Sequence, residues 1–169
     1  MKRKNLYLMC GIPGSGKSTF CNAFVQNNDK IEYISRDKIR FNYLGRGDAY
    51  FSREDEVFTD FVSAISDAID NDLIDEIYVD ATHLNEKSRN KVLRFLDLDC
   101  VNIIPVNFLI DLDLALKRND LREGRECVPR SSLIRMYNSF RPATHQEKYS
   151  YDKIMNVKVT EEGMEIETV

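Results

Sequence analysis

The chain has 169 residues, of which 43% are hydrophobic and 31% are charged, and its net charge at pH 7 is −4. This is the composition of a globular protein with a sizeable core, and no apolar run is long enough to cross a membrane. The four cysteines have neither metal-binding nor redox spacing, which favours free thiols in a reducing compartment. We expect one domain over residues 1–169, in the cytoplasm and without a membrane contact.

Short apolar runs alternate with segments of helical periodicity. Runs rich in β-branched and aromatic residues predict four buried strands, at residues 6–10, 31–35, 76–80 and 101–110. Pro105 in the last run lacks a backbone N–H, so we expect this strand to bulge or to begin late. The clearest helix lies at 54–70, where apolar residues share one stripe. Asn85 suits the cap of a later helix, and Pro129 and Pro142 are placed to begin and end another.

The tail at 153–169 differs from the rest of the chain. Two runs of alternating polarity flank the sequence TEEG, which predicts a final strand or an antiparallel hairpin. Elsewhere strands alternate with helices, which indicates a parallel sheet covered on both faces. We therefore expect an α/β, three-layer fold around a central, mostly parallel, five-stranded sheet.

The sequence GIPGSGKST, residues 11–19, carries the strongest functional signal. It fits the pattern G-x-x-x-x-G-K-[ST], behind an expected strand and ahead of an expected helix. In this P-loop motif, backbone N–H groups surround the β-phosphate of a nucleotide, Lys17 bridges the β- and γ-phosphates, and the Ser18 hydroxyl binds Mg²⁺. We predict that ATP and Mg²⁺ bind through Gly11, Gly14, Ser15, Gly16, Lys17, Ser18 and Thr19.

A P-loop alone does not separate kinases from ATPases and GTPase switches. The chain has no N-K-x-D sequence, the usual reader of guanine, so a GTPase is disfavoured. It is also too short for a motor or transporter ATPase. The P-loop, the small size and the parallel sheet together favour a P-loop kinase fold of the nucleoside-monophosphate-kinase type.

The second expected strand ends in the sequence YISRDKIR, which holds a candidate pair for the phosphate acceptor. Asp37 and Arg40 are three residues apart and share one face if a helix begins here. Asp37 would then accept the proton of an attacking hydroxyl, and Arg40 would bind an anionic part of the acceptor. On the residues alone, it is equally reasonable that Asp37 caps a helix and that Arg40 makes a surface ion pair.

Asp80 ends the third expected strand. Its carboxylate can reach Mg²⁺ through water or steady Arg40, or it can simply begin a turn. His83, in the polar loop that follows, is more typical of a hydrogen-bonded loop residue than of a catalyst.

Arginines crowd a glycine-containing connection at 116–130, which we interpret as an arginine-rich lid that closes over ATP. Arg118, Arg122 and Arg125 would bring guanidinium groups to the transferring phosphoryl group. The alternative is a solvated basic loop.

Four stretches in this order, GIPGSGKST, SRDKIR, VDATHLN and KRNDLREGRECVP with LIRMY, resemble the kinase domain of the phage-type 5′-hydroxyl polynucleotide kinases, over residues 5–141. The resemblance implies transfer of the γ-phosphoryl group of ATP to the 5′-hydroxyl of RNA or DNA. It implies that Lys17 and Ser18 bind ATP and Mg²⁺, and that Arg122 contacts the donor phosphates in the transition state.

On the acceptor side, the same resemblance implies that Asp37 is the general base, that Arg40 binds the acceptor's phosphate and that Asp80 is an active-site carboxylate. The lid REGRECVP is one residue longer than the family pattern, so the role of Arg122 could fall to Arg118 or Arg125 instead. The D-x-D sequence at 111–113 lacks the D-G-T continuation of a phosphatase, so we expect no 3′-phosphatase activity.

Charge and aromatic residues suit a nucleic-acid acceptor. Residues 54–80 contain ten acidic residues and no basic one, whereas residues 85–141 have a surplus of three positive charges. Phe41, Tyr43, Tyr50 and Phe51 lie close to Arg40 in the sequence, where they either stack on bases or belong to the core. A related kinase of a sugar, nucleoside or antibiotic, and an ATP-dependent switch, stay open as alternatives, as do the choice of RNA or DNA and the oligomeric state.

Overall fold

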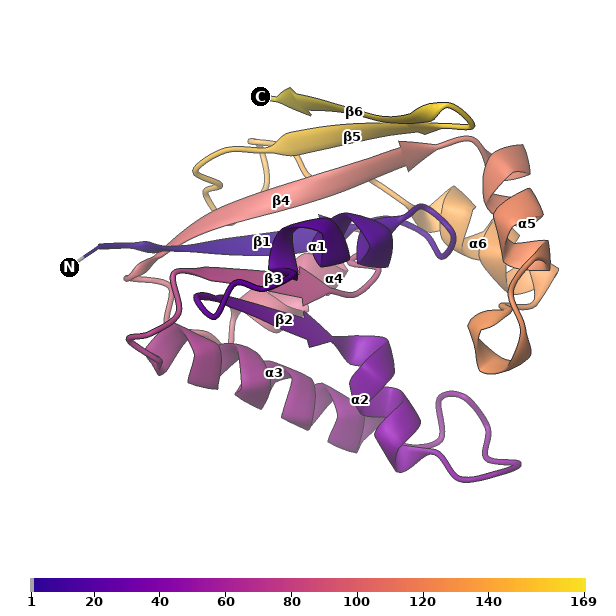
Figure 1. The fold of residues 1–169 in the computed structure, drawn as a ribbon, viewed down its shortest axis with the longest axis horizontal. Coiled ribbons are helices and arrows are strands. Elements are labelled where there is room, and N and C mark those ends of the chain that lie inside the picture. Colours follow the sequence, from indigo (N-terminus) through magenta and orange to yellow (C-terminus); the bar gives the residue numbers. More distant parts are fainter. Residues whose placement is uncertain (1) are drawn as a thin grey trace.

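Six strands form one sheet in the computed structural model, which describes residues 2–169 (Figure 1). The strands are β1 (Lys4–Cys10), β2 (Ile31–Ser35), β3 (Glu76–Asp80), β4 (Val101–Ile110), β5 (Met155–Thr160) and β6 (Gly163–Thr168). Their order across the sheet is β2-β3-β1-β4-β5-β6. β1 therefore lies inside the sheet, and its carboxyl end leads directly into the P-loop.

Five strands run parallel, and the tail adds an antiparallel sixth. β1 pairs with β3 and with β4, β3 pairs with β2, and β4 pairs with β5, all in parallel. This confirms the expected mostly parallel sheet, but the expected number of five strands is wrong, because the tail forms two strands and the sheet has six. β5 and β6 pair in the antiparallel sense, with Val157 opposite Ile166, so the tail forms the hairpin that was one of the two expectations for it.

Helices cover both faces of the sheet. They are α1 (Lys17–Val25), α2 (Arg36–Tyr43), α3 (Glu54–Asp70), α4 (Glu86–Leu93), α5 (Leu112–Asp120) and α6 (Arg130–Ser139), with a 3-10 helix at Gly124–Glu126. Phe20 of α1 packs with Met9 on one face, and Phe61 of α3 packs with Leu8 on the other. Neighbouring residues of a strand point to opposite faces, so β1 contributes to both cores. The three-layer arrangement is confirmed, and α5 and α6 lie beyond the carboxyl end of β4 (Figure 1).

The residues expected to cap, begin and end helices do so in the structure. The side chain of Asn85 caps α4 by accepting a hydrogen bond from the backbone N–H of Ser88 at 3.1 Å. α6 begins directly after Pro129 and ends at Ser139, before Pro142. Within residues 2–169, no helix combines the length and the apolar character that crossing a membrane requires.

Pro105 lies inside β4 without interrupting it, so the expected bulge or late start is wrong. The backbone N–H of Ile103 points toward the segment just before β5, where it donates to Asp152 at 2.9 Å. Residues two apart on a strand point their N–H groups the same way, so Pro105 lacks an N–H on this side. β5 begins to pair only at Val106, and Pro105 therefore removes no hydrogen bond from the sheet.

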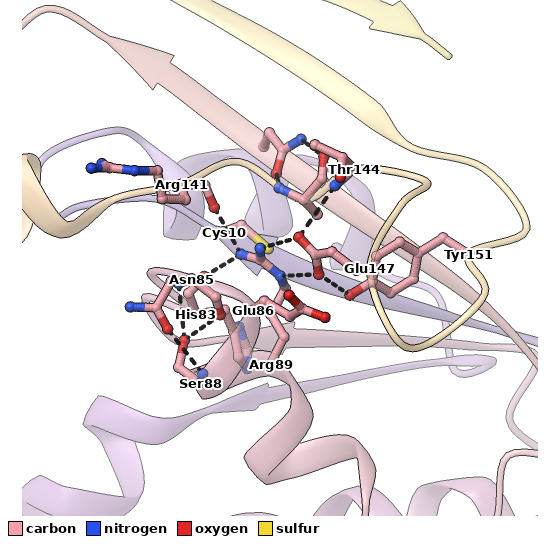
Figure 2. Close-up of polar contacts among 12 residues, drawn as sticks. Cys10, His83, Asn85, Glu86, Ser88, Arg89, Arg141, Thr144, Glu147 and Tyr151 are labelled. Carbon is pink, nitrogen blue, oxygen red and sulfur yellow. Dashed lines mark hydrogen bonds and ion pairs between the residues drawn. The ribbon is translucent and has the colours of Figure 1, made fainter.

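A buried ion pair joins α4 to the segment that leads to β5 (Figure 2). Arg89 is fully buried, and its Nε lies 3.0 Å from Oε2 of Glu147. Nη1 of Arg89 donates to the carbonyl oxygens of His83 at 2.9 Å and of Arg141 at 3.1 Å. The Tyr151 hydroxyl donates to Glu147 at 2.7 Å. The pair is thus surrounded by further hydrogen bonds, which a buried pair needs to offset the loss of water.

His83 is buried as a neutral side chain against β1. Its backbone has a φ of +40°, and its Nδ1 lies 2.6 Å from the carbonyl oxygen of Met9, so Nδ1 carries the proton and donates. Burial lowers the pKa of His83 to about 4, although the hydrogen bond to Met9 acts in the opposite direction. The interpretation of His83 as a hydrogen-bonded loop residue is confirmed.

Glu147→Gln tests the buried pair. The substitution leaves the Arg89 guanidinium buried beside a neutral amide, and removing one partner of such a pair costs about 3–5 kcal/mol. We expect the free energy of unfolding in urea to fall by that amount. As a control, Asp120→Asn breaks the exposed Arg130–Asp120 pair, which should change stability by less than about 1 kcal/mol. Equal unfolding midpoints in the two variants would contradict the importance of the buried pair.

The lowered pKa of His83 predicts a loss of stability in mild acid. The unfolded chain binds a proton at this residue near pH 6.5 and the folded chain only near pH 4, so stability falls as the pH falls between these values. His83→Asn keeps a donor for Met9 and tolerates the left-handed backbone, but it does not titrate. Unfolding free energies at pH 7 and pH 4.5 should therefore fall more in the wild type than in the variant. The same pH dependence in both proteins would rule out neutral burial.

Candidate active site at the carboxyl end of the sheet

The loop between β1 and α1 has the backbone that its glycines predict. Gly14 and Gly16 have φ values of +81° and +92°, which side chains rarely permit. A Cβ atom at Gly11 would lie 2.8 Å from Oγ of Ser15 and 2.9 Å from Cβ of Phe108. Both the backbone geometry and the close packing therefore require glycine. Such a loop at a helix N-terminus presents its N–H groups to phosphate.

Lys17 is the point at which distant parts of the chain meet. Its ammonium group is buried and donates to the carbonyl oxygen of Ile12 at 2.9 Å. Burial lowers the pKa of Lys17, the negative charges of Asp80 and Asp37 raise it, and the positive charge of Arg122 lowers it. All three side chains therefore lie close enough to act on the charge of Lys17. The fold brings the P-loop, the end of β3, the start of α2 and the 116–130 segment to one place.

Asp80 lies beside the predicted metal ligand. Its Oδ2 accepts hydrogen bonds from the Ser18 hydroxyl at 2.7 Å and from the Tyr33 hydroxyl at 2.5 Å. Burial and the charge of Asp80 raise the pKa of Tyr33, so this hydroxyl stays a donor. Asp80 does not contact Arg40, contrary to one of its expected roles. Tyr33 was not predicted, because a tyrosine in an apolar strand is typical of a core.

Asp37 does not cap α2. The cap is Ser35, whose hydroxyl accepts from the N–H of Lys38 at 3.3 Å. The Asp37 side chain is 60% exposed, and it accepts hydrogen bonds from the Tyr50 hydroxyl at 2.7 Å and from the guanidinium of Arg40. The helix-cap interpretation is therefore wrong, and the carboxylate is held in an open position.

Arg40 is only 5% exposed, so the surface ion-pair interpretation is wrong as well. Glu54, at the start of α3, accepts from Nε at 3.1 Å and from Nη2 at 2.9 Å. Nη1 donates to Asp37 and, at 3.0 Å, to the Tyr50 hydroxyl. These contacts use four of the five guanidinium N–H groups. One N–H on Nη2 has no protein partner within residues 2–169. Glu54 was not predicted. Tyr50 was expected to stack on a base or belong to the core, whereas its hydroxyl bonds to Arg40 and Asp37.

Arg118 places the 116–130 segment beside the P-loop. Its Nη1 lies 3.9 Å from where a Cβ atom of Gly16 would be. Its Nη2 donates to the carbonyl oxygen of Thr160, at the end of β5, at 3.4 Å. This arginine therefore borders the loop that the sequence assigns to the nucleotide.

Arg122 and Arg125 lie further along the same segment, which reaches the loop after α2. Arg122 is exposed, and its Nη1 donates to the carbonyl oxygen of Glu126 at 3.4 Å. Arg125 donates to the carbonyl oxygen of Gly45, in the loop after α2. The segment thus runs from the P-loop to the loop that follows Asp37 and Arg40.

The residues of this site suit ATP and Mg²⁺. The buried Oγ of Ser15, inside the glycine loop, has no hydrogen-bond partner in the described part of the chain, so it is free to donate to a phosphate. In that same part, no three His, Cys, Asp or Glu side chains cluster closely enough to hold a metal ion. A metal here would bind Ser18, Asp80 and the phosphates of the nucleotide, which matches the preference of Mg²⁺ for few protein ligands.

Several solved structures have a similar fold. The Pnkp1/Rnl/Hen1 RNA repair complex matches with a TM-score of 0.68 and 20% identity over 88% of this chain and 50% of that chain. A fungal RNA kinase matches with a TM-score of 0.64 and 16% identity, over 95% of this chain and 40% of that chain. A gluconokinase from Sinorhizobium meliloti 1021 matches with a TM-score of 0.59 and 15% identity, over 95% of this chain and 86% of that chain. The chain spans half or less of the first two proteins. These similarities establish the fold as that of the P-loop kinases.

A family model covers most of the chain. The model AAA_33, described as an AAA domain, matches residues 6–143. The match includes the P-loop, Asp37 and Arg40 on α2, the end of β3 and the arginine-rich segment. It coincides with the part of the chain whose motifs resemble polynucleotide kinases. This protein belongs to the AAA domain family and has the fold of a P-loop kinase.

Proposed function

We propose that this protein is a kinase that transfers the γ-phosphoryl group of ATP to the 5′-hydroxyl of a nucleic acid, RNA or DNA, with Mg²⁺. One observation carries the proposal: the exposed carboxylate of Asp37 lies within electrostatic reach of Lys17 and is bonded to the buried Arg40. A base, an anion-binding group and a phosphate-binding loop thus adjoin one another. In this proposal residues 1–169 form one kinase domain, and residues 116–130 are its lid.

The donor side consists of the P-loop and the lid. Lys17 and the N–H groups of the glycine loop hold the β- and γ-phosphates, and Ser18 holds Mg²⁺, with Asp80 binding it directly or through water. When bound, ATP supplies the phosphoryl group and Mg²⁺ neutralises part of its charge. Arg118 borders the nucleotide, and Arg122 reaches the transferring phosphoryl group when the lid closes.

On the acceptor side, Asp37 orients the 5′-hydroxyl and accepts its proton. The hydroxyl oxygen forms a bond to the γ-phosphorus while the bond from that phosphorus to the bridging oxygen of ADP breaks in line. Arg40 binds the nearest phosphate of the acceptor through the N–H that no protein group uses. Glu54 and Tyr50 hold the guanidinium in place for this contact.

A small-molecule acceptor is the second candidate, because both a gluconokinase and an RNA kinase have a fold similar to this one. The buried Arg40 beside an exposed Asp37, and the surplus of positive charge over 85–141, favour an anionic polymer. An ATP-dependent switch would leave the Asp37–Arg40 pair without a function.

Incubation with γ-labelled ATP and Mg²⁺ separates these candidates. The acceptors are 5′-hydroxyl RNA and DNA oligonucleotides, nucleosides and sugars, offered side by side. We expect label at the 5′ end of the oligonucleotides. Label found only in the small molecules would overturn the proposal, and release of free phosphate alone would favour the switch.

Asp37→Asn should lower kcat by about 10²–10⁴-fold, the usual contribution of a general base. The fold should persist because Ser35, not Asp37, caps α2. Asp60→Asn is the matched control, since this carboxylate also accepts a hydrogen bond from a tyrosine, Tyr43, but lies on α3. A variant at Asp37 that unfolds easily yet keeps its kcat would contradict the role of base.

Arg40 and Arg122 should give different kinetic signatures. Arg40→Lys keeps a positive charge beside Glu54 but removes the planar guanidinium with its several donors. It should therefore raise KM for oligonucleotides, and it should raise KM much less for a 5′-hydroxyl nucleoside without a 3′-phosphate. Arg122→Ala should lower kcat for every acceptor, by about 10³-fold or more, since its contact strengthens in the transition state. Equal losses of kcat in both variants, whatever the acceptor, would mean that Arg40 does not bind the acceptor.

A further inference from the structure

The loop between α2 and α3, residues 44–53, presents an aromatic ring to solvent beside the acceptor pair. Phe51 is 60% exposed. Its ring packs edge-on against the ring of Tyr50, with centroids 4.7 Å apart. The Tyr50 hydroxyl is fixed by Asp37 and Arg40, so the surface on which Phe51 rests cannot rotate away.

The guanidinium of Arg40 lies close to both rings. Its carbon is 4.6 Å from the centroid of Tyr50 and 5.5 Å from that of Phe51. A group bound to the free N–H of Arg40 would therefore lie next to Phe51. The other aromatic residues of this region are less available: Tyr43 is bonded to Asp60, and Phe41, which also packs edge-on against Tyr50 at 6.2 Å, is half-buried.

The loop that holds Phe51 carries charges of both signs. Arg53 is paired with Glu56 at 2.8 Å, Arg46 and Asp48 lie close together in the sequence, and Arg125 from the lid segment adds a positive charge where it reaches the carbonyl oxygen of Gly45. Exposed aromatic rings among positive charges are the combination that binds single-stranded nucleic acid, because every base has a face on which to stack.

Exposure alone would not single out this residue, since isolated apolar side chains are common on protein surfaces. Phe95 shows this: it is 53% exposed, lies edge-on to Phe58 at 5.9 Å, and has the guanidinium of Arg94 4.7 Å from its ring. The two phenylalanines differ in position. Phe51 adjoins the side chains that would hold the 5′-hydroxyl and its phosphate, whereas Phe95 follows α4.

We propose that Phe51 is the stacking platform for the terminal base of the acceptor, the base whose sugar carries the 5′-hydroxyl. This inference rests on the proposed function and refines its acceptor to a terminal nucleotide with a base. Asp37 holds the hydroxyl, Arg40 holds the phosphate on the other side of the same sugar, and the base covers the exposed face of Phe51. Stacking on a ring does not read hydrogen-bonding edges, so the site accepts any of the bases.

The kinetic test compares two oligonucleotides that differ only at the 5′ nucleotide, which is either natural or an abasic analogue with the same 5′-hydroxyl and phosphate. Stacking of one base contributes about 1–3 kcal/mol, so the wild type should have a KM about 5- to 150-fold lower for the natural substrate. Phe51→Ala should abolish this preference, because the KM for the natural substrate should rise to that for the abasic one. Phe95→Ala should keep the preference. Equal losses on both substrates in Phe51→Ala, or no preference in the wild type, would overturn the proposal.

A binding test does not depend on turnover. The chain has no tryptophan, so Phe51→Trp introduces a single fluorescent reporter whose ring still stacks, and Phe95→Trp is the control. The natural oligonucleotide should quench the fluorescence of the Phe51→Trp variant more strongly than the abasic one does, and neither should quench the control. Quenching without phosphorylation would support the base platform and overturn the proposed reaction. Phosphorylation without base-dependent quenching would support the reaction and overturn the platform.

Discussion

The guanidinium of Arg89 is fully buried, and a charge in that position needs an anionic partner and further hydrogen bonds to persist. Glu147, 58 residues further along the chain, is the anionic partner. The carbonyl oxygens of His83 and Arg141 accept the further hydrogen bonds. The same guanidinium holds the carbonyl oxygen of His83, whose ring is bonded to Met9 of β1. The next link is a hydrogen bond of 2.8 Å from the N–H of Gly11 to the carbonyl oxygen of Thr82. The first glycine of the P-loop is thus tied to the loop that the ion pair fixes.

A second buried arginine organises the other half of the site. Glu54 on α3 holds Arg40 on α2 by two hydrogen bonds, and it also accepts from Arg36 at 2.5 Å. The carboxylate therefore fixes two helices relative to each other as well as the orientation of the Arg40 fork. The two arginines do different work, although both are buried. Arg89 has its charge neutralised within the core, whereas Arg40 keeps one N–H and an exposed neighbour, Asp37, at the edge of the site.

Local patterns in the sequence predicted the elements that depend on local physics. The P-loop follows from glycine and lysine spacing, the strands from apolar runs, and the cap at Asn85 from one side chain. Partners that meet only in the folded chain were not predictable, because Glu54 and Glu147 look like ordinary surface acids in an acidic chain. The expectation for Pro105 was wrong for the same reason. A proline destabilises a strand only where a neighbouring strand would accept a hydrogen bond from that position, and β5 begins to pair with β4 only at Val106.

The arrangement around Asp37 suits phosphoryl transfer better than reactions that need a strong base. Its carboxylate accepts hydrogen bonds from both Arg40 and Tyr50, which fix its direction. In a loose transition state the attacking hydroxyl keeps its proton until late, so the base must be well placed rather than strongly basic. A carboxylate held by two side chains and open on its remaining side meets that requirement. In the proposed reaction, the same hydrogen bonds would tie Asp37 as the base to Arg40 as the group that binds the acceptor's phosphate, so orientation of the hydroxyl and recognition of the acceptor would depend on one network.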